Sequence, residues 1–379
     1  MPRENQIRPA TLKDVATELG LSAGTVSRAL TRPELVALKT QKKIAEVVKR
    51  LHYIPNAGGR SLRSSTTGTI GAIIQKSGIS TFSQTTLALQ DGLKSFGRTL
   101  IVSQPDNSTD EINHAIRRVL ERGVDGLLLL GEGHDADVLN LIKSRGIPHL
   151  ILWNVRKNID QPYVTVSQSE AGAMAARHLI DLGHRDFAFV GAPLEVNPRA
   201  AARLAGVKKA LKDAGLELPE RAISEELHQF ERAGEAIRRI LKTNPKTTAV
   251  ICTSDFHALG ALRALQESGR NVPNDISIVS FNNNDFSGYT FPSLTTVDLR
   301  QRDLGHAAAK MINQIIEGNS PRSLSLSPIL RIRESSGPPP QKKVENLAID
   351  LLSGKRNKQT REKHSSGGKK SRLKTQVSR

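Results

Sequence analysis

Apolar residues in the first thirty positions repeat with the period of an α-helix. Four of them fall at positions i, i+3, i+4 and i+7 and so share one face: Leu12, Val15, Ala16 and Leu19. Thr11 and Asp14 have the spacing of a capping box, in which two side chains satisfy free N–H groups at a helix start. Gly20 is the residue type that ends a helix in the left-handed conformation. We predict a helix between Thr11 and Gly20.

A second short helix is predicted to start at Ser22, a preferred N-cap residue, and to run to about Leu30. Its apolar positions, which we expect to face the first helix, are Val26, Ala29 and Leu30. Its outward positions are Ala23, Thr25, Ser27 and Arg28. Two short helices joined by a tight turn form a helix-turn-helix, whose second helix fits the DNA major groove. Any surface helical hairpin has the same spacing, so the pattern alone does not establish DNA binding.

A third helix is predicted from Thr40 to Leu51, where four apolar residues share a face and close a small core: Ile44, Val47, Val48 and Leu51. From Thr69 onward, apolar runs alternate with helical patterns. The predicted strands are Ile70–Ile74, Thr99–Val102, Gly126–Leu130, Leu150–Trp153, Phe187–Val190, Ala249–Cys252 and Ile276–Phe281. The predicted helices are Thr86–Phe96, Asp110–Arg122, Glu170–Leu182, Ala200–Ala214, Arg232–Lys242, His257–Ser268 and Arg302–Glu317. Near-continuous apolar strands between helices indicate parallel sheets covered on both faces, an α/β body.

Charge is concentrated at the two ends of the 379-residue chain. Residues 1–65 carry +7 and residues 341–379 carry +9 of the net +18, which leaves +2 for everything between. Two basic ends suit a polyanion such as nucleic acid. Cys252 is the single cysteine, so no internal disulfide can form, and neither a signal peptide nor an apolar run of membrane-spanning length is present. We expect a cytoplasmic protein.

Several sequence words occur in an order that is highly specific. T-L-K-D-V-A…T-V-S-R-A-L is followed by H-Y-x-P-N…R-S-L-R and T-G-T-I-G. This run resembles the LacI-type (lactose/galactose repressor) family, and the likeness continues to about residue 335. The resemblance implies a helix-turn-helix head followed by a periplasmic-binding-protein-like body of two doubly wound parallel-sheet halves joined by three crossovers.

The domain boundaries follow from the resemblance and the composition. We predict a DNA-binding domain at 1–55, a hinge at 56–68, an effector-binding and dimerisation domain at 69–337, and a basic, disordered tail at 338–379. The first half would span 69–160 with a return at 285–320, and the second 161–284 with 321–337. Four tail residues at helical spacing (Val344, Leu347, Ala348 and Leu351) cover only two turns, so we expect a homodimer and not a tetramer.

Arg28 can donate two hydrogen bonds to guanine. In the family, the two residues after the capping serine read bases; here they are Ala23 and Gly24, which have no hydrogen-bonding side chain. The resemblance also implies a hinge helix in the minor groove with a leucine wedged between base steps, and Leu62 matches that leucine. Gly58-Gly59 departs from the family and weakens this helix. The predicted DNA-binding residues are Thr11, Ser22, Ala23, Thr25, Ser27, Arg28, Asn56, Arg60, Leu62 and Arg63.

Three stretches resemble the family's effector contacts and point to Arg203, Asp255 and Asn282. Asn282 stands where most relatives have a carboxylate, so the ligand can present an acceptor or a negative charge there. Trp153 ends a predicted strand and is either a stacking residue or part of the core. Phe82 and Ser83 are further candidates, although the family's S-N-P-F-F word is missing. A sugar or sugar-like effector is favoured, and a nucleobase or another small metabolite is the alternative.

Other classes of function have little support. Gly131–Asp137 brings acidic groups and a histidine together, but we interpret it as a loop in which Asp135 caps a helix; no catalytic, cofactor or metal-binding motif is evident. A transport solute-binding protein would share the body but has no use for residues 1–65. We therefore predict a transcriptional regulator, a repressor and not an enzyme. Its dimer binds a pseudo-palindromic operator, and a metabolite, acting as inducer or corepressor, alters that affinity.

Overall fold

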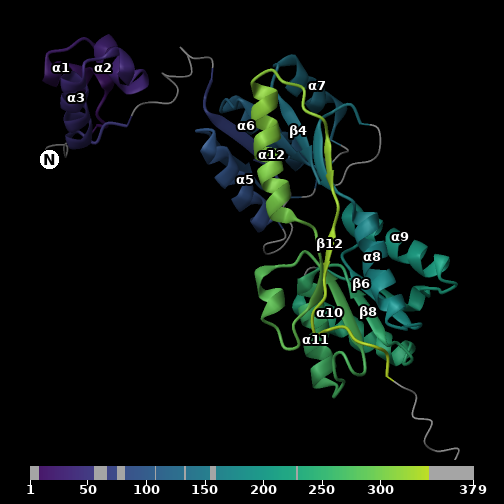
Figure 1. The fold of residues 1–379 in the computed structure, drawn as a ribbon. Helices are drawn as coiled ribbons and strands as arrows, with labels where there is room; N and C mark the ends of the chain where they lie inside the picture. Colours follow the sequence, from purple (N-terminus) through teal and green to yellow (C-terminus); the bar gives the residue numbers. More distant parts are fainter. Residues whose placement is uncertain are drawn as a thin grey trace, which may run out of the picture.

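The computed structural model describes residues 8–54, 66–74, 82–106, 108–131, 134–153, 159–227 and 229–340. They form a small helical head and a larger α/β body made of two halves (Figure 1). The residues between head and body (55–65) and the tail beyond 340 lie outside this description. The predicted disorder of the tail therefore stays a prediction.

The head contains α1 (Leu12–Leu19), α2 (Ala23–Thr31), a short 3-10 helix η1 (Pro33–Leu35) and α3 (Leu38–Arg50). The predicted caps are confirmed: Thr11 and Asp14 form a complete capping box, Gly20 has φ of 65°, and the Ser22 hydroxyl accepts a hydrogen bond from the Thr25 amide. One residue from each α-helix fills the centre, namely Val15, Val26 and Ile44, all at most 1% exposed. The helix-turn-helix therefore follows from local sequence signals closed over one small core.

The first half of the body is a six-stranded parallel sheet in the order β11-β5-β4-β3-β1-β2. Its strands are β1 (Thr69–Ile73), β2 (Thr99–Ser103), β3 (Gly126–Leu130), β4 (His149–Leu152), β5 (Tyr163–Val166) and β11 (Leu324–Leu326). Its helices are α5 (Ser83–Ser95), α6 (Thr109–Glu121), α7 (Ala136–Ser144) and α12 (Gln301–Ile316). Alternate residues of β3 pack into two different cores, Leu128 on the side of α5 and α12 and Leu127 on the side of α6 and α7.

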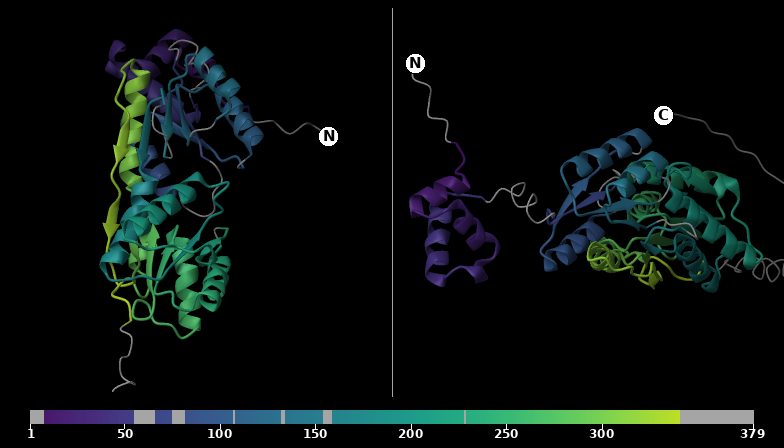
Figure 2. Two further views of the ribbon diagram at one scale, coloured as in Figure 1. Left: turned by 90° about the vertical axis from the view of Figure 1, so that its right-hand side faces the viewer. Right: turned by 90° about the horizontal axis from the view of Figure 1, so that it is seen from above.

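The second half repeats this plan with the order β12-β10-β9-β8-β6-β7, parallel except for β12. Its strands are β6 (Phe187–Gly191), β7 (Ile223–Glu225), β8 (Ala249–Cys252), β9 (Ser277–Phe281), β10 (Thr295–Asp298) and β12 (Ile329–Arg331). Its helices are α8 (Gln168–Asp181), α9 (Pro198–Asp213), α10 (Phe230–Thr243) and α11 (Asp255–Glu267), with 3-10 turns η2 (Glu220–Ala222) and η3 (Asp285–Gly288). The chain passes between the halves after β5, after β10 and after β11, and its last stretch runs along one side of both (Figure 2).

Three predicted boundaries between the halves are wrong. The first half extends to Val166 and not to 160, because β5 pairs with β4 in the first sheet. The return begins after Asp298 and not at 285, because β10 pairs with β9 in the second sheet. The return ends after Leu326 and not at 320, because β11 pairs with β5 in the first sheet. These strands are three or four residues long and lie next to crossings, so pairing partners distant in the chain decide which sheet each one joins.

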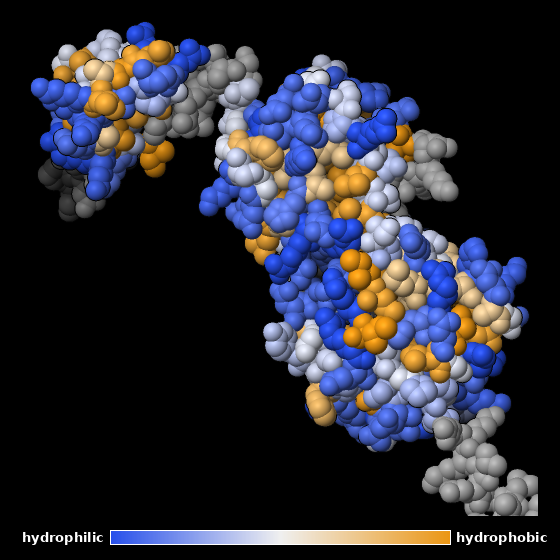
Figure 3. Space-filling model, viewed as in Figure 1, coloured by the Kyte–Doolittle hydropathy of each residue, from blue (hydrophilic) through white to orange (hydrophobic). Residues whose placement is uncertain are grey.

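The surface of the body is mostly hydrophilic, and the apolar residues visible in Figure 3 gather mainly around its middle. No helix among the described residues is long and apolar enough to cross a membrane.

Candidate effector pocket and DNA-reading surface

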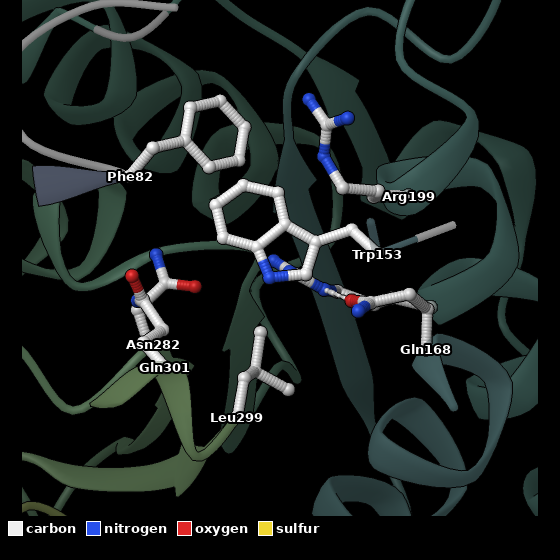
Figure 4. Close-up of a pocket in the computed structure, with 8 residues that line it drawn as sticks. Phe82, Trp153, Gln168, Arg199, Asn282, Leu299 and Gln301 are labelled. Carbon is white, nitrogen blue, oxygen red and sulfur yellow. Dashed lines mark hydrogen bonds between the residues drawn. The ribbon is translucent and has the colours of Figure 1, made fainter. Parts of the chain in front are cut away.

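A pocket lies where the two halves of the body meet. It holds about 280 Å³ of space free of atoms, part of it open to solvent. Its lining residues come from both halves and from the crossing segment, and they are Phe82, Trp153, Gln168, Arg199, Arg203, Asn282, Leu299 and Gln301 (Figure 4). Several of them follow the carboxyl ends of strands, the edge at which open α/β sheets bind ligands. Four of them were predicted from the sequence: Phe82, Trp153, Arg203 and Asn282.

An aromatic pair forms one wall. The rings of Phe82 and Trp153 stack with centroids 3.9 Å apart and an interplanar angle of 29°, as Figure 4 shows. Trp153 adopts a positive φ of 71° directly after β4 and is 6% exposed, so it both lines the pocket and belongs to the core. The guanidinium of Arg199 lies 5.1 Å from the Phe82 ring centroid, a cation–π contact.

Arg203 is buried on α9 and held by groups of the second half. Its Nε donates to Gln168 Oε1 at 2.9 Å, and a terminal nitrogen donates to the carbonyl of Thr253. Burial lowers the pKa of Arg203 to about 9 and the pKa of Arg199 to about 10. Both guanidinium groups therefore remain charged at neutral pH. Among the described residues, no carboxylate forms an ion pair with either, although the charge of the nearby Asp255 acts to raise the pKa of Arg203. The described lining residues therefore contribute two positive charges and no negative one.

Two amide side chains leave polar atoms unused in the pocket wall. Asn282, directly after β9, has φ of 103° and is 2% exposed; its buried Nδ2 has no hydrogen-bond partner among the described residues. Gln301, the first residue of α12, has a buried Oε1 that is likewise unpaired. The wall thus offers one unused donor and one unused acceptor to a ligand.

Asp255 has a different environment from the one predicted. It is 0% exposed, and the pocket lining does not include it. Its Oδ1 accepts from the hydroxyls of Ser280 (2.5 Å) and Thr296 (2.8 Å). Its Oδ2 accepts from the backbone and side-chain amides of Asn284 (2.6 and 3.1 Å) and from the Ser287 hydroxyl (2.9 Å). We therefore correct its assignment: Asp255 holds together the ends of β9 and β10 behind the pocket.

Ser83 is also reassigned, because it is exposed on the first turn of α5 and outside the pocket lining. Four lining residues were not predicted from the sequence: Gln168, Arg199, Leu299 and Gln301. Gln168, Arg199 and Gln301 stand in the first turn of a helix. Their position after a strand or a crossing was a usable signal, since helices that follow parallel strands start at the ligand-binding edge.

The outward face of α2 carries the predicted base-reading residues. Ala23, Gly24 and Arg28 are exposed, and Thr25 and Ser27 are half-buried. The Thr11 and Ser22 hydroxyls are engaged in the caps of α1 and α2. Asn56, Arg60, Leu62 and Arg63 lie outside the described residues, so their role in the hinge stays a prediction.

Asp135, from the acidic segment Gly131–Asp137 singled out in the sequence, is the N-cap residue of α7. Asp135 caps α7 by accepting from the Asp137 amide at 3.0 Å, as predicted. The part of the chain that the structure describes contains no group of three or more histidine, cysteine, aspartate and glutamate side chains that could hold a metal ion.

Comparison with known proteins decides the family. The transcriptional repressor PurR of Escherichia fergusonii is 33% identical over 330 residues, which cover 86% of this chain and 96% of PurR. Residues 11–56 match the family described as bacterial regulatory proteins, lacI family. The chain belongs to the LacI family. It is thus a DNA-binding transcriptional regulator, as the resemblance implied.

Other LacI-family proteins agree with this assignment. Catabolite control protein A of Priestia megaterium is 31% identical over 304 residues, covering 80% of this chain and 92% of that protein. Residues 176–336 match a periplasmic binding protein-like domain. The structure of the lac repressor dimer bound to operator and the anti-inducer ONPF is similar with a TM-score of 0.77 and 26% identity, covering 87% of this chain and all of that one. The transcriptional regulator CelR in complex with cellobiose has a TM-score of 0.64 and 26% identity, covering 86% of this chain and all of that one.

Proposed function

We propose that this regulator binds a pseudo-palindromic operator as a homodimer, with α2 in the major groove of each half-site. The exposure of Arg28 supports a bidentate contact to guanine, worth about 1–3 kcal/mol of discrimination. Ala23 and Gly24 offer no hydrogen-bonding group, so the half-site relies on Arg28, on the predicted Leu62 wedge and on DNA deformability. One head buries too little surface for tight specific binding, which favours a dimer. Large apolar side chains exposed on the body support such pairing, namely Leu87, Tyr289 and Phe291.

The effector we propose is a sugar-like metabolite that carries an acidic group, such as a sugar acid or a sugar phosphate. The observation that carries this proposal is the presence of two guanidinium groups and unused amide atoms in a pocket whose described lining residues include no carboxylate. Neutral sugars present mainly hydroxyl donors, which a carboxylate accepts best. An anionic group instead gains charge-assisted hydrogen bonds from Arg199 and from Asn282 Nδ2.

A nucleobase is the second candidate ligand. The aromatic pair supports it, because a planar base can stack on either ring once Phe82 and Trp153 separate. A base without a negative charge leaves Arg199 without an ionic partner, which is why the sugar acid is preferred.

In the proposed mechanism, a ligand bridging the two halves changes their relative position and thereby the geometry of the two hinges of the dimer. Effector and operator must then change each other's affinity by the same factor. The sequence is compatible with either sign of this coupling.

Two experiments test the proposal. Selection of bound duplexes from a random library is expected to yield an inverted repeat, and Arg28→Ala to lose preference at one base pair per half-site. A screen of sugar acids, sugar phosphates, neutral sugars and nucleobases uses the emission of Trp153, the only tryptophan. Binding by neutral sugars alone would contradict the acidic ligand; the absence of any preferred duplex would contradict operator binding.

A further inference from the structure

Two helices of the first half run from the pocket toward the hinge. α5 begins directly after Phe82, and α12 begins with Gln301; both residues line the pocket. At the other ends, Arg98 follows α5 by three residues, and Asn313 lies in the last turn of α12. Twelve residues of helix separate Gln301 from Asn313, which is about 18 Å. Figure 1 shows the two helices side by side on one face of the sheet.

The two helices are closely packed against each other. A Cβ atom built on Gly305 would lie 2.4 Å from the Thr85 carbonyl oxygen, and one built on Gly92 would lie 2.6 Å from the Cβ of Ala309. Contacts of this kind bring the two backbones together, so one helix cannot slide without the other. Gly305 lies against Thr85 and, further along, Ala309 lies against Gly92. Residue numbers therefore increase in the same direction along both helices, which means that the helices are parallel. We refer to them as the α5–α12 pair.

A cluster of hydrogen bonds joins the far end of this pair to Thr67 and Gly68, the last two residues of the predicted hinge segment. Arg98 Nε donates to Asn313 Oδ1 at 2.8 Å, and Arg98 Nη1 donates to Asp125 Oδ2 at 2.9 Å. Asp125 Oδ1 accepts from the Thr67 amide at 2.6 Å and from its hydroxyl at 2.9 Å, and Asp125 Oδ2 accepts from the Gly68 amide at 2.9 Å. The Arg98–Asp125 ion pair is buried, with side chains 14% and 6% exposed, and solvent screens it little.

We propose that Arg98, Asp125 and Asn313 are positioning residues that tie the end of the hinge segment, at Thr67 and Gly68, to the α5–α12 pair. A change at Phe82 or Gln301 is thereby transmitted to the hinge. The proposal rests on the proposed function, because it supplies the route between effector pocket and DNA. A ligand that touches Arg203 or Asn282 in the second half and Gln301 on the pair shifts the pair as one body. The hinge end follows because Asp125 holds two consecutive backbone amides.

The test uses the full chain with Asn313→Ala and a matched control, Gln314→Ala, which removes the neighbouring amide of the same helix. Each is titrated with the selected duplex, and anisotropy of the labelled duplex and Trp153 emission are recorded together. We expect duplex affinity within about threefold of the parent for both variants. We expect the Trp153 change on duplex binding to fall at least about fivefold in Asn313→Ala only, in the range of coupling mutations. Asn313 Nδ2 also donates to Glu317 Oε1 at 2.8 Å, so the rescue variant is Asn313→Asp combined with Glu317→Gln. It keeps an oxygen for Arg98 without opposing two carboxylates, and it is expected to restore most of the change.

A second measurement needs no DNA. Hydrogen exchange at Thr67 and Gly68 is expected to accelerate about tenfold in Asn313→Ala but not in Gln314→Ala. Gln301→Ala, at the pocket end, is expected to accelerate the same amides in the parent and to add nothing in Asn313→Ala. Equal exchange in all variants, an unchanged Trp153 response in Asn313→Ala, or no Trp153 response of the parent to bound duplex would overturn the inference. If no duplex is preferred, the proposed function fails, and the exchange results still decide this inference.

Discussion

Asp255 and Asn282 are buried polar residues of the same half, 0% and 2% exposed, yet their surroundings are opposite. Both carboxylate oxygens of Asp255 accept hydrogen bonds, from four residues in all. The Nδ2 of Asn282 has no partner within the described chain, and neither has Gln301 Oε1. A satisfied buried group stabilises the wall, whereas an unsatisfied one costs about 1–3 kcal/mol. This difference supports the proposal that Asp255 stabilises the second half and that Asn282 and Gln301 contact the ligand.

Removing the Asp255 carboxylate should have the largest effect on stability. Asp255→Ala leaves five donors in a buried site without their acceptor, so we expect the free energy of unfolding to fall by about 3–5 kcal/mol. Urea denaturation of the full chain measures it. Asp213→Ala, at an exposed position of α9, is the control and should change stability by less than about 0.5 kcal/mol. A similarly small loss of stability in Asp255→Ala would contradict the distinction drawn between Asp255 and Asn282.

Arg199 should matter for binding more than for folding. Its guanidinium donates no hydrogen bond to any residue that the structure describes. Arg199→Met should therefore weaken binding of an acidic ligand by about 1.5–3 kcal/mol, the range for hydrogen bonds to charged groups. Trp153 emission titrations measure the affinity. Arg203→Met should differ by also lowering stability, because Gln168 and the Thr253 carbonyl lose their donor. Equal stability losses in both variants would contradict this division.

Exchanging the unused amide for a carboxylate sharpens the comparison. Asn282→Asp turns a donor into an acceptor with a negative charge, so affinity for sugar acids should fall about tenfold or more and neutral sugars should gain. Parallel titrations of one sugar acid and its neutral parent sugar measure the ratio. An unchanged ratio would show that Asn282 does not face the charged part of the ligand.

The smallest expected effect is a gain in stability. Gln301→Leu replaces an unpaired buried acceptor with an apolar side chain of similar size, so the ligand-free protein should become more stable by about 1 kcal/mol. Ligand affinity should fall in the same variant. Thermal unfolding with and without ligand measures both. A loss of stability without ligand would mean that Gln301 is part of the framework, as Asp255 is.

Much of the fold was predictable because its signals are local. The caps at Thr11 and Ser22, the stop at Gly20 and the long amphipathic helices each depend on residues within a few positions of one another. The strands that were missed are the short ones, β5, β7, β10, β11 and β12, each of three or four residues. Such segments have too few apolar positions to show the two-residue alternation of a strand. The sheet that β5 and β10 join is decided by pairing partners distant in the chain.

The sequence by itself determined the family, the helix-turn-helix and the alternation of strand and helix, because those depend on spacing along the chain. Only the tertiary structure decided that the Asp255 carboxylate is fully hydrogen-bonded, whereas Asn282 and Gln301 each keep an unpaired polar atom among the described residues. The contacts of Arg98 with Asp125 and Asn313 were also decided by the tertiary structure. Whether a polar atom finds a partner depends on which distant elements the packing brings within about 3 Å of it, and no spacing within one segment specifies that.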